Sequence, residues 1–308
     1  MTKSPQKTAQ PFLKWAGGKS QLLSQFENLY PLELKQGQIQ HYIEPFIGGG
    51  AVFFEVAQKY QIASASIYDI NPELILVYQV IQKDVERLIE EVGNLARDYH
   101  QCPLTERKCF YFKLRDRYNL QKQEIGDRQY DSHWVSRAAL LIFLNRTCFN
   151  GLFRLNSKGE FNVPPGSYKN PKILDADNLR SVSELLQIAE IAVGDFELCE
   201  PAIKPGTLIY FDPPYRPLSK TANFTSYSTF TFCDRQQTRL AQFFRHLDTT
   251  HDVKMMLSNS DPKNEDPTDD FFEELYQPFK IHRVSANRAI NSNGKKRGQI
   301  DELVITNY

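Results

Sequence analysis

The sequence lacks the features that mark membrane, secreted and metal-binding proteins. No apolar run approaches the ~18 residues of a transmembrane helix, and the polar N-terminus has no apolar signal-peptide core. The five cysteines are odd in number and share no metal-ligand spacing, and the six histidines form no paired pattern. We therefore expect reduced thiols, no bound metal, no membrane contact and a cytoplasmic protein.

The chain also lacks net charge, because 37 basic residues balance 37 acidic ones. No global field therefore attracts a polyanion. The balance is uneven, however, since residues 107–172 hold thirteen Lys and Arg against five Asp and Glu. Such a local surplus indicates a surface that faces phosphate, and the alternative is an ordinary solvated face.

Residues 207–215, Thr-Leu-Ile-Tyr-Phe-Asp-Pro-Pro-Tyr, organise the chain. Their apolar run predicts a strand buried on both faces, and the two prolines end it at Asp212. In an open parallel sheet, ligands bind at the carboxyl ends of strands. The sequence therefore places the Asp212 carboxylate where chemistry takes place, with Tyr215 on the loop that follows.

The Asp-Pro-Pro-Tyr motif suits the binding of a planar amine. The Asp212 carboxylate can accept one N–H of an exocyclic amino group, and the Pro213 carbonyl can accept the other. These two acceptors localise the nitrogen lone pair and direct it at an electrophile, while Tyr215 offers a flat face for stacking. The alternative is a surface acid in a proline turn, which the buried strand and the tyrosine disfavour.

A strand at 41–46, a glycine loop at 47–50, a helix at 51–60 and a strand ending at Asp69 predict a nucleoside-binding βαβ unit. Asp69 would bind the ribose hydroxyls. The unit does not distinguish NAD from S-adenosyl-L-methionine, although Phe53 stands at the third glycine position of the dinucleotide pattern, which counts against NAD. A later strand at 188–193 leads to Asp195 and Phe196, which suit the amine and the face of an adenine.

Near the N-terminus, Gly17 and Gly18 predict a tight turn into a helix over residues 20–29. The first N–H groups of that helix, together with Lys19, would meet a carboxylate or a phosphate. Trp15, beside the glycines, is equally compatible with a packed core.

Amphipathic helices are predicted at 74–97 and 107–121, and a further, apolar helix at 135–145. Residues 145–168 then combine glycine turns with four Asn, basic residues and aromatics. Arg and Asn side chains match base edges and aromatic rings wedge into base stacks, so we interpret this segment as a hairpin that enters DNA. The alternative is a structural loop. Residues 218–232 predict a loop that faces substrate, and 281–308 predict two strands around a basic turn at 292–297.

Nearly the whole chain resembles the Dam family of DNA adenine methyltransferases, in the alpha group, because it carries a series of that family's motifs in the same order. They are Phe-Leu-Lys-Trp-Ala-Gly-Gly-Lys at 12–19, Glu-Pro-Phe-Ile-Gly-Gly-Gly at 44–50, Asp-Ile-Asn at 69–71, Asn-Gly-Leu-Phe-Arg-Leu-Asn at 150–156, Gly-Glu-Phe-Asn-Val-Pro at 159–164, Asp-Pro-Pro-Tyr at 212–215 and Leu-Ser-Lys-Thr-Ala-Asn-Phe-Thr-Ser-Tyr at 218–227. This family transfers a methyl group from S-adenosyl-L-methionine to the amino nitrogen of adenine.

The resemblance implies an α/β fold with a doubly wound, mostly parallel seven-stranded sheet whose last strand pair is antiparallel. An inserted, mainly helical DNA-recognition domain would carry a β-hairpin. Residues 1–72 and 169–308 would form the catalytic domain, and residues 73–168 the target-recognition domain. Double-stranded DNA would be the partner of a monomer associated with the nucleoid. The enzyme would either act alone or belong with a cognate restriction endonuclease that acts separately, and the sequence leaves both open.

Position by position, the resemblance implies three sets of site residues. The catalytic residues would be Asp212, Pro213, Pro214 and Tyr215. The S-adenosyl-L-methionine site would comprise Trp15, Ala16, Gly17, Lys19, Phe46, Gly48, Gly50, Asp69, Asp195, Phe196 and Asp212. The DNA contacts would come from Lys14, Phe149, Asn150, Leu152, Arg154, Asn156, Pro164 and Tyr168.

Among the DNA contacts, Phe149 and Asn150 would intrude beside a flipped base, and the others would read GATC, apart from Asn156. Phe149 stands where some members have a tyrosine, and Pro165 and Ser167 also depart from the family pattern. GATC remains the expected target.

Other acceptors and other classes of protein stay as alternatives. An RNA adenine or a protein glutamine amide is also a planar amine, but the basic segment favours a DNA duplex. A nicotinamide oxidoreductase is supported only by the glycine loop and Asp69. The intact Asp-Pro-Pro-Tyr motif argues against a catalytically silent DNA-binding protein.

Overall fold

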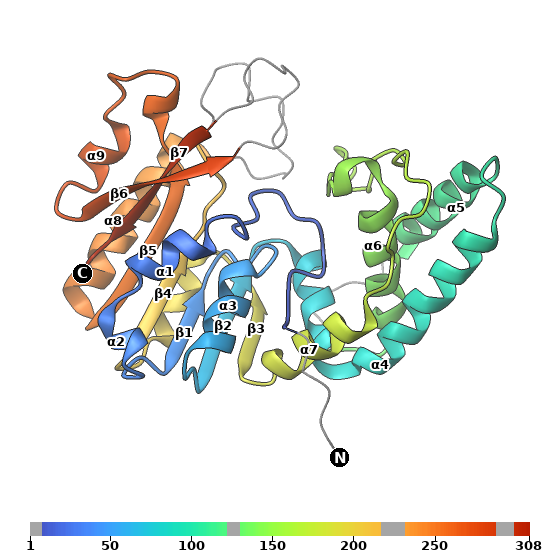
Figure 1. Ribbon diagram of the computed structural model, residues 1–308, viewed down its shortest axis with the longest axis horizontal. Coiled ribbons are helices and arrows are strands. Elements are labelled where there is room, and N and C mark those ends of the chain that lie inside the picture. The colour runs from blue at the N-terminus through green and yellow to red at the C-terminus, as the bar shows by residue number, and fades with distance from the viewer. Residues whose placement is uncertain (1–7, 122–129, 217–231, 288–298) are drawn as a thin grey trace.

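The computed structural model describes residues 8–121, 130–216, 232–287 and 299–308. One sheet of seven strands runs through the molecule in the order β3-β2-β1-β4-β5-β7-β6 (Figure 1). The strands are β1 (His41–Glu44), β2 (Ser64–Asp69), β3 (Ala189–Val193), β4 (Thr207–Phe211), β5 (Val253–Ser260), β6 (Lys280–Asn287) and β7 (Gln299–Thr306). Strands β1 to β5 pair in parallel, and β7 runs antiparallel to both β5 and β6. This confirms the predicted sheet.

Helices cover both faces of the sheet, and β4 shows how. Leu208 and Tyr210 pack into one core with α1 (Leu23–Leu29) and α3 (Ala51–Lys59). Ile209 and Phe211 pack into a second core with α8 (Asp234–Thr250) and α9 (Phe271–Leu275). Because successive side chains of a strand point to opposite faces, an unbroken apolar run needs a core on each side.

The strand order brings three carboxylates together at the carboxyl ends of neighbouring strands. The chain passes from β1 to β2 and β3 on one side and then returns to β4 and β5 on the other. The order therefore reverses between β1 and β4, which is where open α/β sheets bind ligands. Glu44 and Asp69 end β1 and β2, and Asp212 follows β4 directly.

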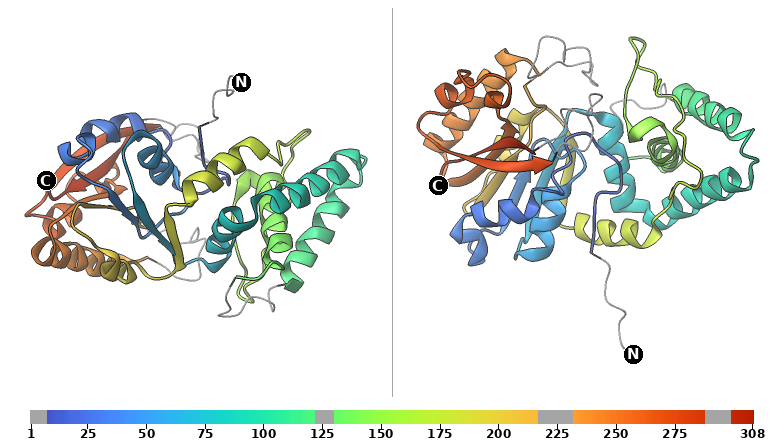
Figure 2. Two further views of the ribbon diagram at one scale, coloured as in Figure 1. Left: turned by 90° about the horizontal axis from the view of Figure 1, so that it is seen from below. Right: turned by 45° about the horizontal axis from the view of Figure 1, so that its top comes forward.

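Three long helices are inserted between β2 and β3 and lie to one side of the sheet (Figures 1 and 2). They are α4 (Pro72–Gln101), α5 (Arg107–Leu120) and α6 (Trp134–Thr147), and α7 (Ala176–Leu186) leads from them back to the sheet. The three predicted helices are thus confirmed. A buried ion pair of 2.5 Å between Arg137 of α6 and Glu73 of α4 ties the insertion together.

The first turns of α4 also pack on the sheet. Nε2 of Gln82 donates to the carbonyl of Ala189 at 2.8 Å, and Nε2 of Gln79 donates to that of Ile191 at 3.1 Å. These bonds occupy carbonyls of the edge strand β3. The helix has non-helical backbone angles at Asp84, where it bends. The division of the chain at residue 72 remains a prediction.

Two local predictions need correction. The helix expected from residue 20 is α1, which begins only at Leu23, and the short α2 (Leu32–Lys35) was not expected. The expected hairpin at 145–168 has two isolated antiparallel bridges, Leu155–Phe161 and Cys148–Pro165, in place of two strands. A proline has no N–H for a ladder, and Asn156 forms its own turn.

Residues 218–231 of the predicted substrate-facing loop and the basic turn at 292–297 lie outside the described residues. Among the helices of the described part of the chain, none is long and apolar enough to cross a membrane. The same residues contain no cluster of three or more His, Cys, Asp or Glu able to hold a metal ion.

Candidate active site

The Asp212 carboxylate lies where the chain leaves the sheet. Strand β4 is buried along its whole length, and Pro213 and Pro214 cannot extend its ladder. Oδ1 of Asp212 lies 2.9 Å from Nζ of Lys19 and accepts a hydrogen bond of 3.0 Å from Oγ of Ser258. Burial raises the pKa of the Asp212 carboxyl, and the Lys19 ammonium opposes that rise.

Lys19 is only 3% exposed. Its Nζ donates to the carbonyl of Gly17 at 2.6 Å and lies 4.5 Å from the centre of the Tyr215 ring. The sequence predicted that Lys19 and the first N–H groups of a helix would meet an anion together. The Lys19 ammonium lies beside the Asp212 carboxylate, whereas the helix α1 begins further along the chain, at Leu23. The ammonium therefore has a carboxylate on one side and an aromatic face on another.

The Tyr215 ring is held by its hydroxyl, which donates to the carboxylate of Glu302 on β7. Burial, followed by the charges of Asp212 and Glu302, raises the pKa of this hydroxyl. The hydroxyl therefore stays protonated and acts as a donor, which leaves the ring with one face toward Lys19.

Three residues of this site escaped the sequence analysis: Glu44, Ser258 and Glu302. Glu44 is 2% exposed and accepts a hydrogen bond of 2.7 Å from the Tyr42 hydroxyl, and burial raises its pKa. The sequence did carry a signal for Glu44, because this residue is the first of the motif at 44–50 that contains the glycine loop. Ser258 and Glu302 had no local signal, since only strand pairing brings them to the end of β4.

The loop between β1 and α3 presents its backbone to Asp69. The N–H of Gly48 donates to Oδ2 of Asp69 at 3.1 Å, and the N–H of Asn71 donates to Oδ1 at 2.9 Å. Gly50 has a φ of 73°, and a Cβ there would lie 2.5 Å from the Tyr78 hydroxyl oxygen, so this position needs glycine. Burial raises the pKa of Asp69 to about 6.

Asp195 and Phe196 follow β3 and are covered by Arg239 of α8, which the sequence analysis missed. The guanidinium donates to both oxygens of Asp195, at 2.7 and 3.1 Å, and lies 4.5 Å from the centre of the Phe196 ring. Phe196 is 2% exposed and stacks on Phe46 with 5.6 Å between ring centres. A carboxylate has about four lone-pair sites, so Asp195 can still accept further hydrogen bonds.

Apolar side chains are exposed at the carboxyl ends of β2 and β3, in the region between Asp69 and Asp195. They are Ile70, Val193 and Leu198, which are 44%, 48% and 56% exposed. Exposed apolar groups beside two acids are suited to a ligand that has an apolar face and polar edges.

Asn145, near the end of α6, ties the N-terminal segment to the loop that follows α6. Its Oδ1 accepts from the N–H of Lys14 at 2.8 Å, and its Nδ2 donates to the carbonyls of Lys14 and Gly151, both at 2.9 Å. Phe149 in this loop is 52% exposed, and Asn150 has a left-handed φ of 54°. Three residues predicted to contact DNA therefore lie together.

The side chains of Lys14 and of the other predicted DNA-contact residues differ in the hydrogen bonds that they already make within the protein. Nζ of Lys14 lies 3.3 Å from the Tyr168 hydroxyl and 4.4 Å from the centre of its ring. Arg154 is exposed, with Nε donating to Oδ1 of Asn162 at 2.7 Å. Asn156, in contrast, accepts two backbone N–H groups of its own turn, which is a structural use of the side chain.

Trp15 joins the glycine loop to the recognition segment. Its ring stacks on Phe153 with 5.7 Å between ring centres, and a Cβ on Gly48 would lie 3.1 Å from it. Trp15 is therefore packed, as the alternative interpretation held, and it is packed against predicted cofactor residues. Of the remaining predicted residues, Ala16 and Pro164 are exposed and Leu152 is half-buried.

Comparison with known proteins identifies one family. The family model for D12 class N6 adenine-specific DNA methyltransferases matches residues 15–290. The type II methyltransferase M.MjaIII of Methanocaldococcus jannaschii is 50% identical over 299 residues, which are 97% of this chain and 99% of that protein. The type II methyltransferase M1.LlaDCHI of Lactococcus lactis subsp. cremoris is 41% identical over 300 residues, 97% and 95% of the two chains. The DNA adenine methylase of Escherichia coli K12 is 34% identical over 300 residues, 95% and 93% of the two chains.

Proposed function

This chain belongs to the D12 class N6 adenine-specific DNA methyltransferases, and we propose that it transfers a methyl group from S-adenosyl-L-methionine to a flipped adenine within GATC in duplex DNA. The family membership confirms the resemblance to Dam enzymes and makes the protein an adenine-specific DNA methyltransferase. The methyl donor, the flipping of the base and the GATC target are the proposed part.

The position of the Lys19 ammonium is the observation that supports this proposal most. It lies 2.9 Å from Oδ1 of Asp212 and 4.5 Å from the centre of the Tyr215 ring. A nitrogen with N–H donors thus sits at the place that an adenine amine would take if an acid held it and an aromatic ring stacked on its base. The Pro213 carbonyl would accept the second N–H of the amine.

The proposed reaction is a direct in-line displacement. An adenine inside a duplex cannot be reached, so it is flipped out at a cost of a few kcal/mol. The bound donor supplies a methyl group on a positively charged sulfur. Asp212 and Pro213 orient the amine so that its lone pair faces that methyl group, and catalysis is mainly positioning and electrostatics. Asp212 has no proton to remove before the attack, because the nitrogen becomes acidic only as it gains the methyl group. The electron pair of the broken carbon–sulfur bond would stay on the sulfur, and the Asp212 carboxylate would then accept the proton that the methylated nitrogen loses.

The residues around Asp69 fit the nucleoside of the proposed donor. Asp69 uses each oxygen for one backbone N–H, which leaves lone pairs for ribose hydroxyls. The glycine loop lets a ligand approach the backbone. Asp195 provides an acceptor for an adenine amine, beside the exposed apolar side chains of Ile70, Val193 and Leu198.

The affinity for S-adenosyl-L-methionine is expected to fall as the pH drops through about 6, where burial places the pKa of Asp69. Protonation removes the charge that attracts the ribose hydroxyls, so Kd from calorimetric titration should rise by at most about tenfold per pH unit below that value. In the Asp69→Asn variant this dependence should flatten. An equally steep dependence in wild type and variant would rule out Asp69 as its source.

The free energy of unfolding should depend on the ionisation of Asp69 in the opposite direction, because it falls as the pH rises. The pKa of Asp69 is raised from its ordinary value of 3.8 to about 6 in the folded protein, so ionisation is less favourable there than in the unfolded chain. The contribution of this group to the free energy of unfolding is therefore largest below pH 3.8 and is lost as the pH rises through about 6. Denaturant unfolding of wild type and Asp69→Asn at several pH values isolates it.

Recognition of GATC can be tested with a panel of duplexes in which each base pair of the site is replaced in turn. Wild type should methylate only the intact site. The Arg154→Ala variant should lose discrimination at one position by roughly 10- to 100-fold in kcat/KM, because an arginine that reads a base edge contributes about 1–3 kcal/mol. Lys158→Ala, in the same turn, should affect all duplexes alike. Equal transfer by wild type to every duplex would rule out GATC as the target.

A further inference from the structure

Three consecutive residues at the carboxyl end of β5 each contact the segment from Asp212 to Arg216. Oγ of Ser258 donates to Oδ1 of Asp212 at 3.0 Å, the N–H of Arg216 donates to Oδ1 of Asn259 at 3.4 Å, and Oγ of Ser260 donates to the Arg216 carbonyl at 3.3 Å. The three side chains belong to residues that are 0%, 0% and 6% exposed. The parallel pairing of β4 and β5 up to the end of β4 brings these residues alongside the segment.

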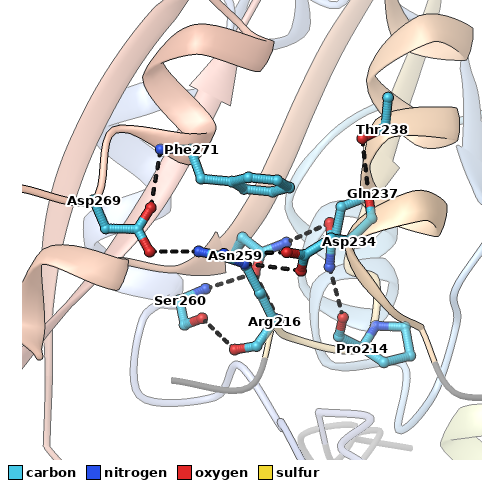
Figure 3. A network of polar contacts seen from close by, with 9 residues as sticks. All are labelled: Pro214, Arg216, Asp234, Gln237, Thr238, Asn259, Ser260, Asp269 and Phe271. Atoms are coloured by element: carbon cyan, nitrogen blue, oxygen red, sulfur yellow. Dashed lines mark hydrogen bonds and ion pairs between the residues drawn. The ribbon is translucent and has the colours of Figure 1, made fainter. Parts of the chain in front are cut away.

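Gln237 of α8 contacts the same segment from the other side (Figure 3). Its Nε2 donates to the Pro214 carbonyl at 3.1 Å, and its Oε1 accepts from Nδ2 of Asn259 at 3.1 Å. The Pro214 carbonyl and the Arg216 N–H belong to the two peptide groups that flank Tyr215. The Gln237–Asn259 pair therefore holds the peptide group before Tyr215 and the peptide group after it.

The orientation of both amides follows from their backbone partners. A carbonyl such as that of Pro214 only accepts, so Gln237 must present its NH₂ group there and its oxygen to Asn259. The backbone N–H groups of Arg216 and Ser260 only donate, at 3.4 and 2.9 Å, so Asn259 must present its oxygen to them. Gln237 and Asn259 are both 0% exposed, so water does not replace a hydrogen bond that is lost here.

The Arg216 side chain fixes the far end of the segment. Its guanidinium donates to both oxygens of Asp234 at 2.9 and 3.1 Å and to Asp269 at 2.6 Å, and it lies 4.1 Å from the centre of the Phe271 ring (Figure 3). These contacts hold the backbone of Arg216 in place, so that its N–H faces Asn259.

Two prolines make such support necessary. Pro213 and Pro214 have no backbone N–H, so the segment between Asp212 and Tyr215 offers few groups by which the sheet can hold it. The Pro214 carbonyl and the Arg216 N–H are the groups that the amide pair binds.

We propose that Gln237 and Asn259 are positioning residues for methyl transfer, which hold the Asp-Pro-Pro-Tyr backbone in the shape that lets its groups converge on the adenine amine. These groups are the Asp212 carboxylate, the Pro213 carbonyl and the Tyr215 ring. The inference rests on the proposed function, in which they hold the base. Neither amide touches the substrate itself.

The Gln237→Met variant tests this inference, because methionine keeps the length of the side chain and loses both hydrogen bonds. The single-turnover rate of methyl transfer at saturating DNA and S-adenosyl-L-methionine should fall at least about tenfold, since displacement of a reacting group by 1 Å costs up to about a hundredfold. The Kd values for duplex and donor should stay within about twofold of wild type, because most of the residues predicted to bind them lie outside the segment from Asp212 to Arg216.

Gln82→Met is the matched control. Nε2 of Gln82 also donates to backbone carbonyls, those of Leu186 and Ala189 at 2.7 and 2.8 Å, but beside the edge strand β3, away from the central strand β4. Its rate should stay within about twofold of wild type. A rate loss in Gln82→Met equal to that in Gln237→Met would mean that only general stability is involved, and it would overturn the proposal.

Asn259→Asp provides a second route if Gln237→Met does not fold. Aspartate keeps the acceptor for the Arg216 N–H, and its carboxylate puts a charged acceptor in place of the donor to Gln237. At a pH where this carboxyl group is ionised, kcat should fall while KM for the duplex is unchanged. A wild-type rate in either folded variant contradicts the inference. Asp212→Ala distinguishes failure of the proposed function from failure of the positioning role. If that variant is active, the proposed function is wrong. If it is inactive and Gln237→Met has the wild-type rate, only the positioning role is wrong.

Discussion

Replacing Asp212 by alanine is expected to reduce the rate of methyl transfer at least about a thousandfold, while the affinity for S-adenosyl-L-methionine stays within about threefold of wild type. The variant loses the acceptor that orients the adenine amine, an electrostatic effect that is large in a buried site. Single-turnover transfer of a labelled methyl group measures the rate, and calorimetric titration measures the affinity.

The structural cost of this change needs its own control. Asp212→Ala leaves Lys19, which is 3% exposed, without its ion-pair partner, and the loss of one partner of a buried pair costs about 3–5 kcal/mol. Glu73→Ala breaks the buried pair with Arg137 in the insertion at a similar cost and does not touch the site. If Glu73→Ala keeps its activity and Asp212→Ala loses it, the effect is chemical. A folded Asp212→Ala protein with near-normal turnover would refute the assignment.

Replacing Tyr215 by alanine is expected to lower the rate up to about a hundredfold, and replacing it by phenylalanine less than about tenfold. The stacking of a base on an aromatic ring contributes about 1–3 kcal/mol, and alanine loses all of it. Phenylalanine keeps the ring and loses only the hydrogen bond that the hydroxyl donates to Glu302. The measurement is the single-turnover rate of both variants on one duplex at saturating cofactor.

The comparison of the two Tyr215 variants separates the ring from the hydroxyl. Glu302→Met is the matched change on the other side of the contact, because methionine keeps the length of the side chain and offers no oxygen to the Tyr215 hydroxyl. It should behave like Tyr215→Phe. If phenylalanine were as damaging as alanine, the hydroxyl and Glu302 would be the important groups, and the stacking role of Tyr215 would be wrong.

The features that the sequence predicted well have local causes. Strand β4 and the position of Asp212 follow from an apolar run that two prolines end, and both signals lie within nine residues, 207–215. The helices α4 and α5 follow from apolar periodicity, and α6 follows from an apolar run that is buried on all sides. The glycine loop and Asp69 were placed together because a strand, a turn and a helix occur in sequence, and the contact between Gly48 and Asp69 follows from them.

The features that the sequence did not show depend on contacts between distant parts of the chain. Ser258 and Glu302 reach the site because of the register between β5 and its two neighbours. Arg239 reaches Asp195 because α8 packs in one core with Phe196 and with β4, which no local pattern encodes. The ion pair between Lys19 and Asp212 joins the N-terminal segment to the end of β4 in the same way. Periodicity and turn chemistry identify elements, whereas the partners of a side chain are set by how the elements pack.

The identity of the methylated base tests the central claim most directly. Wild-type protein is incubated with labelled S-adenosyl-L-methionine and either of two duplexes that differ only in whether a single GATC site is intact or scrambled. Each duplex is then digested to nucleosides, and the labelled nucleoside is identified. The account predicts N6-methyladenine from the GATC duplex alone. Label on any other base, or equal amounts of N6-methyladenine from both duplexes, would contradict it.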